Sequence, residues 1–225
     1  MFAVIFEVHP KRERKDEYLA LAKHLKPILE AMDGFIDNER FGSKRTQGSI
    51  LSLSTWRDEK SLVRWRTQSE HHSVQEKGRF EVFESYHLRV GAIVADSHPP
   101  SEGEIDEKRF DETAIGEAKV CTITEVTVAE ESSLVVKEAT VFSAHLGLKV
   151  GIEGLIDQEI FESITNPGKL LLLGSWKDLN SARAFIPQLF ADISSLRHRQ
   201  VRVLRDYGMS DRREAPQYYP DVKTV

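Results

Sequence analysis

The sequence has little that would place the protein outside the cytoplasm. Among its 225 residues there is a single cysteine, Cys121, so no disulfide can form within the chain, and its apolar neighbours favour a buried thiol. The N-terminal apolar run, Phe2 to Phe6, is too short for a secretory signal. No apolar segment approaches the roughly 20 residues that span a bilayer. We therefore expect a cytoplasmic protein without a membrane partner.

The sequence also lacks an excess of positive charge. Its formal net charge is −5 at pH 7, which provides no basic surface for nucleic acid. Spacings typical of metal ligands, phosphate-binding glycine loops and nucleophile elbows are absent as well. The sequence thus predicts no nucleic-acid partner and no metal site.

What the chain does contain is one pattern twice. The segment 34–61 aligns without a gap with 154–181, and 12 of its 28 positions are identical. Each copy begins with a glycine and reaches a tryptophan, Trp56 or Trp176, two residues before an aspartate. A period of 120 residues has the length of a small domain rather than of a solenoid repeat. We expect the two tryptophans to pack at equivalent strand ends.

Each copy reads as strand, helix, hairpin, helix and strand. In the first copy the hydrophobic periodicity predicts these elements at 2–8, 12–32, 35–43 with 49–56, from about 58, and 82–94. In the second copy it predicts them at 120–128, 131–146, 155–176, 178–196 and 199–206. Pro27 should kink the first helix or start a second segment, because proline has no backbone N–H.

The order βαββαβ is that of a ferredoxin-like unit, with both helices on one face of an antiparallel sheet. The apolar run Leu170 to Leu173 indicates that the other sheet face is covered too. We therefore predict an α+β fold in which two tandem units, 1–95 and 118–208, pack their sheets together as an intramolecular α/β barrel. An acidic linker, 96–117, joins the units, and a C-terminal extension, 209–225, lies over the body with its tyrosines as anchors.

Several motifs of the chain point to one family. They are Leu25-Lys26-Pro27-Ile28-Leu29, Gly34-Phe35-Ile36, Glu39-Arg40-Phe41, Trp56-Arg57-Asp58, Trp65-Arg66, Glu70-His71, Gly78-Arg79 and Tyr86-His87-Leu88-Arg89-Val90. With these motifs the chain, apart from linker and extension, resembles the antibiotic-biosynthesis monooxygenase domain family, of the dimeric α/β-barrel fold. Such proteins include cofactor-independent oxygenases of phenols or quinols, haem-degrading enzymes and proteins without known activity.

The haem-degrading branch of this family also has two tryptophans nine residues apart, as Trp56 and Trp65 are. Its iron ligand is a histidine ten residues after the second tryptophan, where this chain has Gln75. The asparagine that the branch carries in its first strand is missing here. The resemblance therefore implies no cofactor, although His71 and His72, one helical turn before Gln75, leave haem binding open.

The two copies diverge where the second helix ends. Residues 65–72 are polar and aromatic, whereas the matching residues 185–192 are mostly apolar. Because empty or unpaired polar cavities are costly, we expect the working cavity in the first unit, lined by Trp65 and one of the two histidines. Adjacent residues of a helix point in different directions, so at most one of His71 and His72 faces it. The matching space in the second unit should be filled by Phe185, Leu189 and Phe190.

Charged residues that both copies retain are expected to be structural. They are Glu7 and Glu125, expected in hydrogen bonds; Arg79 and Arg199, expected to pair with carboxylates across the barrel; and Asp37 and Glu39 with Asp157 and Glu159, expected in solvated or inter-sheet roles.

The leading functional hypothesis is a cofactor-independent monooxygenase that acts on a small electron-rich aromatic, such as a phenol or quinol. His72 or His71 would remove the hydroxyl proton, Trp65 and Tyr86 would stack on the substrate, and Arg79 would stabilise negative charge. The alternatives are a non-catalytic module that binds a small molecule or haem, and a protein whose duplication serves assembly alone. A monomer with an internal pseudo-dimer and a homodimer both fit the sequence.

Overall fold

The structure, a computed structural model, describes residues 1–101, 105, 111–128, 139–148, 151–190 and 193–216. Its strands are β1 (Phe2–Pro10), β2 (Phe35–Ser43), β3 (Ile50–Trp56), β4 (Phe83–Asp96), β5 (Val120–Val128), β6 (Leu155–Ser163), β7 (Lys169–Trp176) and β8 (Ile193–Gly208). Its helices are α1 (Lys15–Glu30), α2 (Glu59–Thr67), α3 (Ser69–Lys77), α4 (Ala139–His145) and α5 (Leu179–Arg183), with short 3-10 and π turns at Arg12–Arg14 and Gly78–Val82. No helix within the described ranges is long and apolar enough to cross a membrane.

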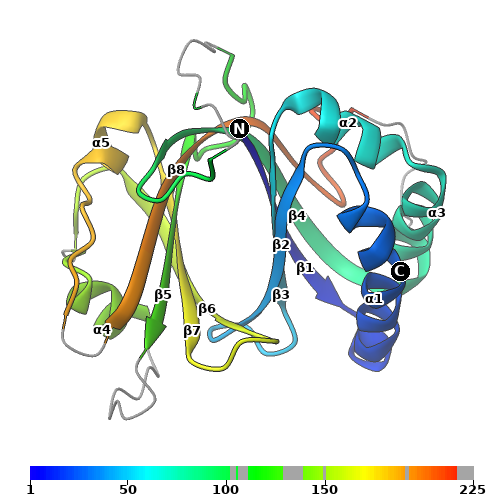
Figure 1. The fold of residues 1–225 in the computed structure, drawn as a ribbon, viewed down its shortest axis with the longest axis horizontal. Coiled ribbons are helices and arrows are strands. Elements are labelled where there is room, and N and C mark those ends of the chain that lie inside the picture. Colours follow the sequence, from blue (N-terminus) through cyan, green and yellow to red (C-terminus); the bar gives the residue numbers. More distant parts are fainter. Residues whose placement is uncertain (102–104, 106–110, 129–138, 149–150, 191–192, 217–225) are drawn as a thin grey trace.

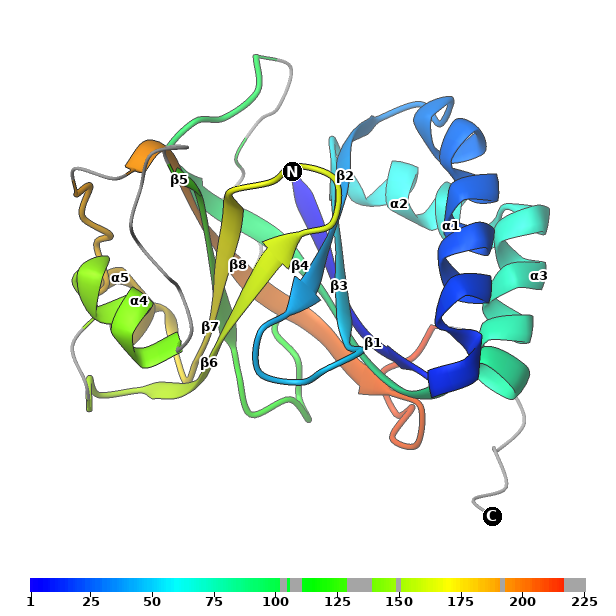
Figure 2. The ribbon, with the colours of Figure 1, turned by 90° about the horizontal axis from the view of Figure 1, so that it is seen from below.

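The strands close into one antiparallel barrel in the order β1-β3-β2-β6-β7-β5-β8-β4. The first unit contributes four neighbouring strands and the second unit the other four, and β2 with β6 and β4 with β8 join them. Helices α1, α2 and α3 cover the outside of the first unit, and α4 and α5 that of the second (Figure 1). The view from below shows the same arrangement, with the helices outside and the sheets facing each other (Figure 2).

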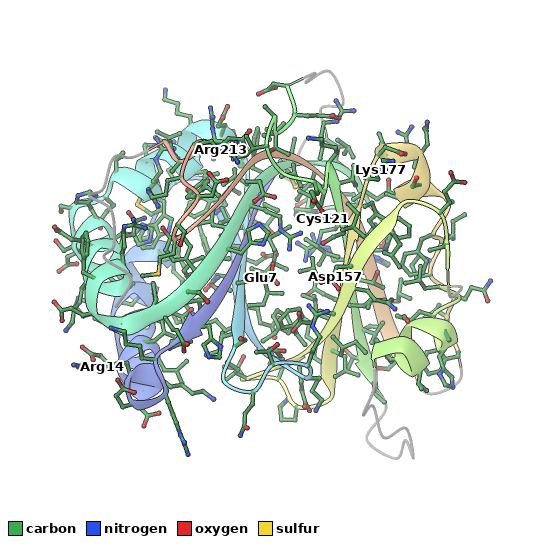
Figure 3. The ribbon with its side chains drawn as sticks, turned by 180° about the vertical axis from the view of Figure 1, so that it is seen from behind. Glu7, Arg14, Cys121, Asp157, Lys177 and Arg213 are labelled. Atoms are coloured by element: carbon green, nitrogen blue, oxygen red, sulfur yellow. The ribbon has the colours of Figure 1, made fainter. Side chains whose placement is uncertain are left out.

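The core of the barrel is built by both units. Every second residue of a strand points inward, and these side chains form one cluster that includes Ile5, Phe41, Ile123, Phe161 and Val201. Cys121 is buried within it (Figure 3), and burial raises the pKa of its thiol. The predicted fold, two ferredoxin-like units that form an intramolecular α/β barrel, is confirmed.

The repeated hairpins lie where the sequence predicts them. Gly34 and Gly154 precede β2 and β6 with φ of +80° and +81°, a conformation that favours glycine. Trp56 and Trp176 end β3 and β7, are fully buried, and pair with the first residues of the neighbouring strands. Helix α1 runs through Pro27 to Glu30 as one helix, so the alternative of a second segment is wrong.

The second helix of the second unit is much shorter than predicted. We expected a helix over 178–196, but α5 ends at Arg183 and β8 already begins at Ile193. Pro187 explains the difference, because it lacks an N–H and disfavours a helical conformation at the preceding residue. The amide of Gln188 instead donates to the carbonyl oxygen of Leu146, at 2.9 Å, beyond the end of α4. The first helix of this unit is predicted over 131–146. Helix α4 confirms its C-terminal part, and residues 131–138 lie outside the described residues.

Parts of the linker and the extension pack against the barrel. The amide of Thr113 donates to the carbonyl oxygen of Val203 in β8. The carboxylate of Glu214 accepts hydrogen bonds from the Thr113 hydroxyl and from the amides of Ala114 and Asp206. Residues 111–116 are thereby held beside the end of β8. The tyrosines predicted as anchors lie outside the described residues.

Candidate active site

Trp65 and His71, two predicted site residues, lie together. The two rings stack with centroids 4.0 Å apart and planes at 13°, and Nδ1 of His71 lies 2.9 Å from the carbonyl oxygen of Trp65. The other face of Trp65 packs against Trp56, and the indole is 9% exposed. Burial lowers the pKa of His71 to about 4, so its imidazole is neutral at pH 7. This pair belongs to the packed layer between helices and sheet.

His72 and Gln75 complete the predicted region on α3. His72 is exposed, while the side-chain nitrogen of Gln75 lies 3.3 Å from both ring nitrogens of His71. Because the Trp65 ring and the Gln75 amide crowd the His71 imidazole, this arrangement does not fit His71 as an iron ligand of haem. Within the described residues no cluster of histidine, cysteine or carboxylate groups is placed to hold a metal ion.

In the second unit the space that matches Trp65 is filled in part as predicted. Phe185 is buried and stacks on Trp176, and Phe190 packs against the same cluster. Leu189 is 67% exposed, so its predicted role as filling is wrong. The reason is the early end of α5, which leaves Leu189 between α5 and β8 rather than on the inner face of a helix.

Arg79 and Tyr86, the other two predicted substrate-binding residues, also lie together. Nη1 of Arg79 donates to the carbonyl oxygen of Met209 at 2.7 Å and to the Tyr86 hydroxyl at 3.3 Å. Arg212 donates to the same hydroxyl. Tyr86 packs in a hydrophobic cluster with Phe6 and Phe83 that is separate from the cluster of Trp65. The structure therefore divides the predicted site between two places.

Two buried arginines link the two units inside the barrel. Arg89 donates to Glu7 and to the Ser175 hydroxyl of the other unit. Arg199 donates to Glu125 and, across the units, to the Thr55 hydroxyl. The hydrogen bonds predicted for Glu7 and Glu125 are present.

These contacts also correct the pairing of arginines between the copies. Ile5 pairs with Arg89 and Ile123 pairs with Arg199 in the strand register, so Arg199 is the counterpart of Arg89 and not of Arg79. Matching positions are 120 residues apart in the hairpins but 110 apart in β4 and β8. The second unit is shorter because its chain enters β8 soon after α5.

The repeated hairpin acids join the units. Glu39 accepts hydrogen bonds from Ser163, Asn166 and Lys169 of the second unit. In the same way, Glu159 of the second unit accepts hydrogen bonds from Ser43 and Arg45 of the first unit. Of the two predicted roles, the structure selects the inter-sheet one for both glutamates.

The barrel has two charged ends. All neighbouring strands are antiparallel, so β1 and β5 run in opposite directions and the equivalent residues Glu7 and Glu125 lie at opposite ends. We define the His87 end by Glu7, His87, Arg89, Asp157 and Asp206, and the Arg197 end by Asp37, Asp96, Glu125, Arg197 and Arg199. Glu7 and Asp157 lie on opposite sides of the interior (Figure 3).

Two adjoining cavities lie at the His87 end. One, of about 450 Å³, is lined by charged residues, among them Glu7, Arg45, His87, Arg89, Asp157 and Asp206. The other, of about 370 Å³, is lined by Tyr86, His87, Tyr207, Met209 and neighbouring residues of linker and extension. Both volumes fall in the range of small-molecule sites. His87, Gly116 and Asp206 line both cavities.

His87 and Asp206 are not among the site residues that the sequence predicts. The signal was present, because at the correct register His87 corresponds to Arg197 and Asp206 to Asp96. A histidine in one copy and an arginine in the other is a difference at an otherwise symmetric position. The 120-residue offset of the hairpins does not hold in the last strands, so it pairs His87 with the wrong residue of the second unit.

The barrel of two ferredoxin-like units, with cavities at one end, defines a dimeric α/β-barrel protein folded within one chain. Residues 1–77 match the family described as antibiotic biosynthesis monooxygenase. The jasmonate monooxygenase ABM of Pyricularia oryzae is 43% identical over 225 residues, which are 98% of this chain and 99% of that protein. The chain belongs to the antibiotic biosynthesis monooxygenase family.

Two further proteins are similar to this chain. The uncharacterized protein YqjZ of Bacillus subtilis is 29% identical over 92 residues, which are 41% of this chain and 78% of that protein. The structure of the aldoxime dehydratase OxdRE in complex with butyraldoxime has a TM-score of 0.55 at 14% identity, covering 93% of this chain and 80% of that one. At this identity the likeness concerns the fold alone.

Proposed function

We propose that the protein is a cofactor-independent monooxygenase that acts on a small electron-rich aromatic with a hydroxyl group, such as a phenol or quinol. The observation that carries the proposal is the 370 Å³ cavity with Tyr86 and Tyr207 on its wall. Aromatic side chains favour an aromatic ligand through offset or edge-to-face contacts. Family membership over the whole chain supports the oxygenation chemistry.

In this proposal the substrate itself supplies the electrons. Removal of its hydroxyl proton gives an anion that reacts directly with O₂, and loss of water then leaves C=O in place of an activated CH₂. The balance is CH₂ + O₂ → C=O + H₂O, so no external reductant is consumed. Tyr86 contacts the ring of the substrate, and Arg79 holds the Tyr86 hydroxyl from behind the cavity wall.

The base of this reaction is a histidine. His71 and His72 are the residues that the sequence nominates, with Trp65 as the neighbouring aromatic. A pKa of about 4 keeps the imidazole of His71 neutral but makes it a weak proton acceptor. Its ring is also packed against Trp65, in a cluster apart from Tyr86.

The test is oxygenation by purified protein in air-saturated buffer without added metal, flavin or haem. We expect O₂ consumption, and label from isotopic O₂ in the product, with phenols or quinols that carry an activated CH₂ group. Jasmonate is included because a relative of similar length is named for it.

Turnover of jasmonate alone would contradict the proposal of an aromatic substrate but would still support monooxygenase activity. Binding of phenols without O₂ consumption would favour the non-catalytic module, and a Soret band in the purified protein would reveal haem. The cytoplasmic location and the number of chains in the assembly stay predictions.

A further inference from the structure

His87 lies between two carboxylates at the wall shared by the two cavities. Nε2 of His87 is 2.6 Å from Oδ1 of Asp206, and Nδ1 is 3.7 Å from Oε1 of Glu7. A carboxylate that accepts a hydrogen bond from one ring nitrogen leaves the other nitrogen as the proton acceptor. With Asp206 on Nε2, the lone pair of Nδ1 is the one that takes up a proton.

The imidazole of His87 is more accessible than the carboxylate that it contacts. Its side chain is 46% exposed, whereas that of Asp206 is only 13% exposed, so the imidazole is accessible and its partner is shielded. The other charged groups that line the cavity are Arg45, Arg89, Glu117, Asp157 and Glu159. Arg45 is paired with Asp157 and Glu159, and Arg89 with Glu7.

The Arg197 end of the barrel differs from the His87 end in the groups that pair with its carboxylates. There Arg197, the counterpart of His87, pairs with Asp96 at 2.8 Å and with Asp37 at 3.5 Å. Lys169 pairs with Glu39 and Glu125 at the same end. Permanent cations thus neutralise the carboxylates of the Arg197 end. At the His87 end the equivalent position, opposite Glu7, holds an imidazole in place of a guanidinium.

The linker is fitted closely to Asp206. A Cβ atom at Gly116 would lie 2.5 Å from Oδ2 of Asp206 and 2.8 Å from its Cβ, so only glycine leaves the carboxylate in place. Gly116 is itself fixed by a hydrogen bond from its amide to Thr113, which Glu214 holds. The linker segment 113–116, which Glu214 holds in place, therefore packs directly against the Asp206 side chain.

We propose that His87 is the catalytic base of the oxygenation and that Asp206 is its positioning residue, with the substrate hydroxyl directed at Nδ1 of His87 in the two adjoining cavities that His87 lines. This inference rests on the proposed function for its reaction. It assigns the base to the barrel end rather than to α3, where the sequence nominates His71 and His72.

In the proposed reaction one proton passes from the substrate to His87 and back. The O–H bond of the substrate breaks, an N–H bond forms at Nδ1, and the charge of the imidazolium is offset by Asp206 and Glu7. The substrate anion reduces O₂ and forms a C–O bond. The imidazolium returns its proton to the peroxide oxygen, which regenerates the neutral base. The resulting hydroperoxide then loses water and leaves C=O.

The first experiment compares His87→Gln with Arg197→Gln, the matched change at the other end of the barrel. We expect turnover to fall by about 10²-fold or more in His87→Gln, the usual effect of losing a general base, and to change little in Arg197→Gln. Added imidazole should restore part of the turnover of His87→Ala, which a structural role of the side chain would not allow. Melting temperatures show whether the variants are folded.

The second experiment concerns Asp206. Asp206→Asn should lower kcat by about 10-fold or more with little change in KM, because the amide no longer fixes the ring as an acceptor. A rise in KM with unchanged kcat in this variant would assign Asp206 to substrate binding and overturn the positioning role.

A nitrophenol probe separates failure of this inference from failure of the proposed function. Its phenolate absorbs visible light, so proton transfer to the protein is seen without any oxygenation. We expect ionisation of the bound probe in the wild type and its loss in His87→Gln. If phenols are oxygenated but His87→Gln keeps full turnover while His72→Ala or His71→Ala loses it, the base lies on α3 and the inference is overturned. If nothing is oxygenated, the proposed function fails, and ionisation of the probe alone decides whether His87 is a base.

Discussion

At the scale of single residues, the interior of the barrel is organised by buried charges that reach across the two units. Arg199 is 1% exposed, and its guanidinium satisfies Glu125 from its own unit and Thr55 from the other. A buried ion pair adds little net stability compared with apolar residues, but a single unpaired charge is costly. Such pairs therefore fix how the two sheets face each other more than they add to the free energy of unfolding.

Breaking the ion pair of Arg199 and Glu125 should therefore lower the stability of the fold. Arg199→Met should lower the free energy of unfolding by about 3 kcal/mol, the low end for a broken buried pair, because Glu125 stays buried but keeps Lys169 as a partner. The double variant Arg199→Met with Glu125→Leu should recover a large part of the loss. Urea unfolding of the two variants and the wild type measures both values. A double variant less stable than Arg199→Met would contradict the prediction.

The buried imidazole of His198 should make the folded state less stable in acid. Burial lowers the pKa of His198 to about 4, and its Nε2 has no hydrogen-bond partner among the described residues. Since the pKa in the unfolded chain is about 6.5, the unfolded state binds the proton first as the pH falls. The stability contributed by the neutral imidazole is therefore complete above pH ~6.5 and is lost between pH ~6.5 and ~4.

The change expected from His198 is about 3 kcal/mol at most, since one pKa unit corresponds to 1.36 kcal/mol. His198→Leu, which places the apolar residue of the counterpart Leu88 there, should make the free energy of unfolding depend less on pH across this window. Urea unfolding at several pH values gives the slope. An equally steep slope in His198→Leu would show that other groups cause the acid sensitivity.

At the scale of elements, the structure separates what local sequence determines from what contacts determine. The hairpins follow the sequence closely, because Gly34 and Gly154 mark their starts and the strands pair with their chain neighbours. Helix α5 does not, since its apolar spacing continues past the point where Pro187 prevents a helix. His87 was missed for a related reason: its partner Asp206 is 119 residues away in the chain, and only the register of β4 with β8 brings them together.

The hairpin starts give a prediction with a control inside the same turn. In Gly154→Ala the new Cβ would lie 2.2 Å from the Ser181 hydroxyl oxygen, and φ is +81°. Gly151 has a similar φ of +74°, but a Cβ there meets nothing within 4 Å. Gly151→Ala should cost only the left-handed strain of about 1–2 kcal/mol, and Gly154→Ala clearly more. Thermal unfolding compares the two, and equal losses would show that the close contact with Ser181 is unimportant.

At the scale of the whole molecule, the duplication closes a barrel that neither unit can close alone. Nine residue pairs join β4 to β8, whereas only three, Phe41 to Ser43 with their partners, join β2 to β6. The sequence predicted this closure from one strand with apolar residues on both faces. It did not show which end of the barrel carries the two cavities, because the correspondence of His87 with Arg197 appears only in the pairing register of β4 and β8 with their neighbours.

The closure makes a prediction about the first unit alone. A fragment of residues 1–95 would expose the inward side chains of its sheet, among them Ile5, Phe41 and Leu53, which are buried in the full chain. It would also leave β2 and β4 as open edges that offer unpaired backbone groups to another chain. We expect the fragment to self-associate, with two copies replacing the two units of the barrel. Light scattering at matched concentrations, with the full chain as control, measures this association. A fragment that stays monomeric and unfolds cooperatively would show that the unit is stable without a partner sheet.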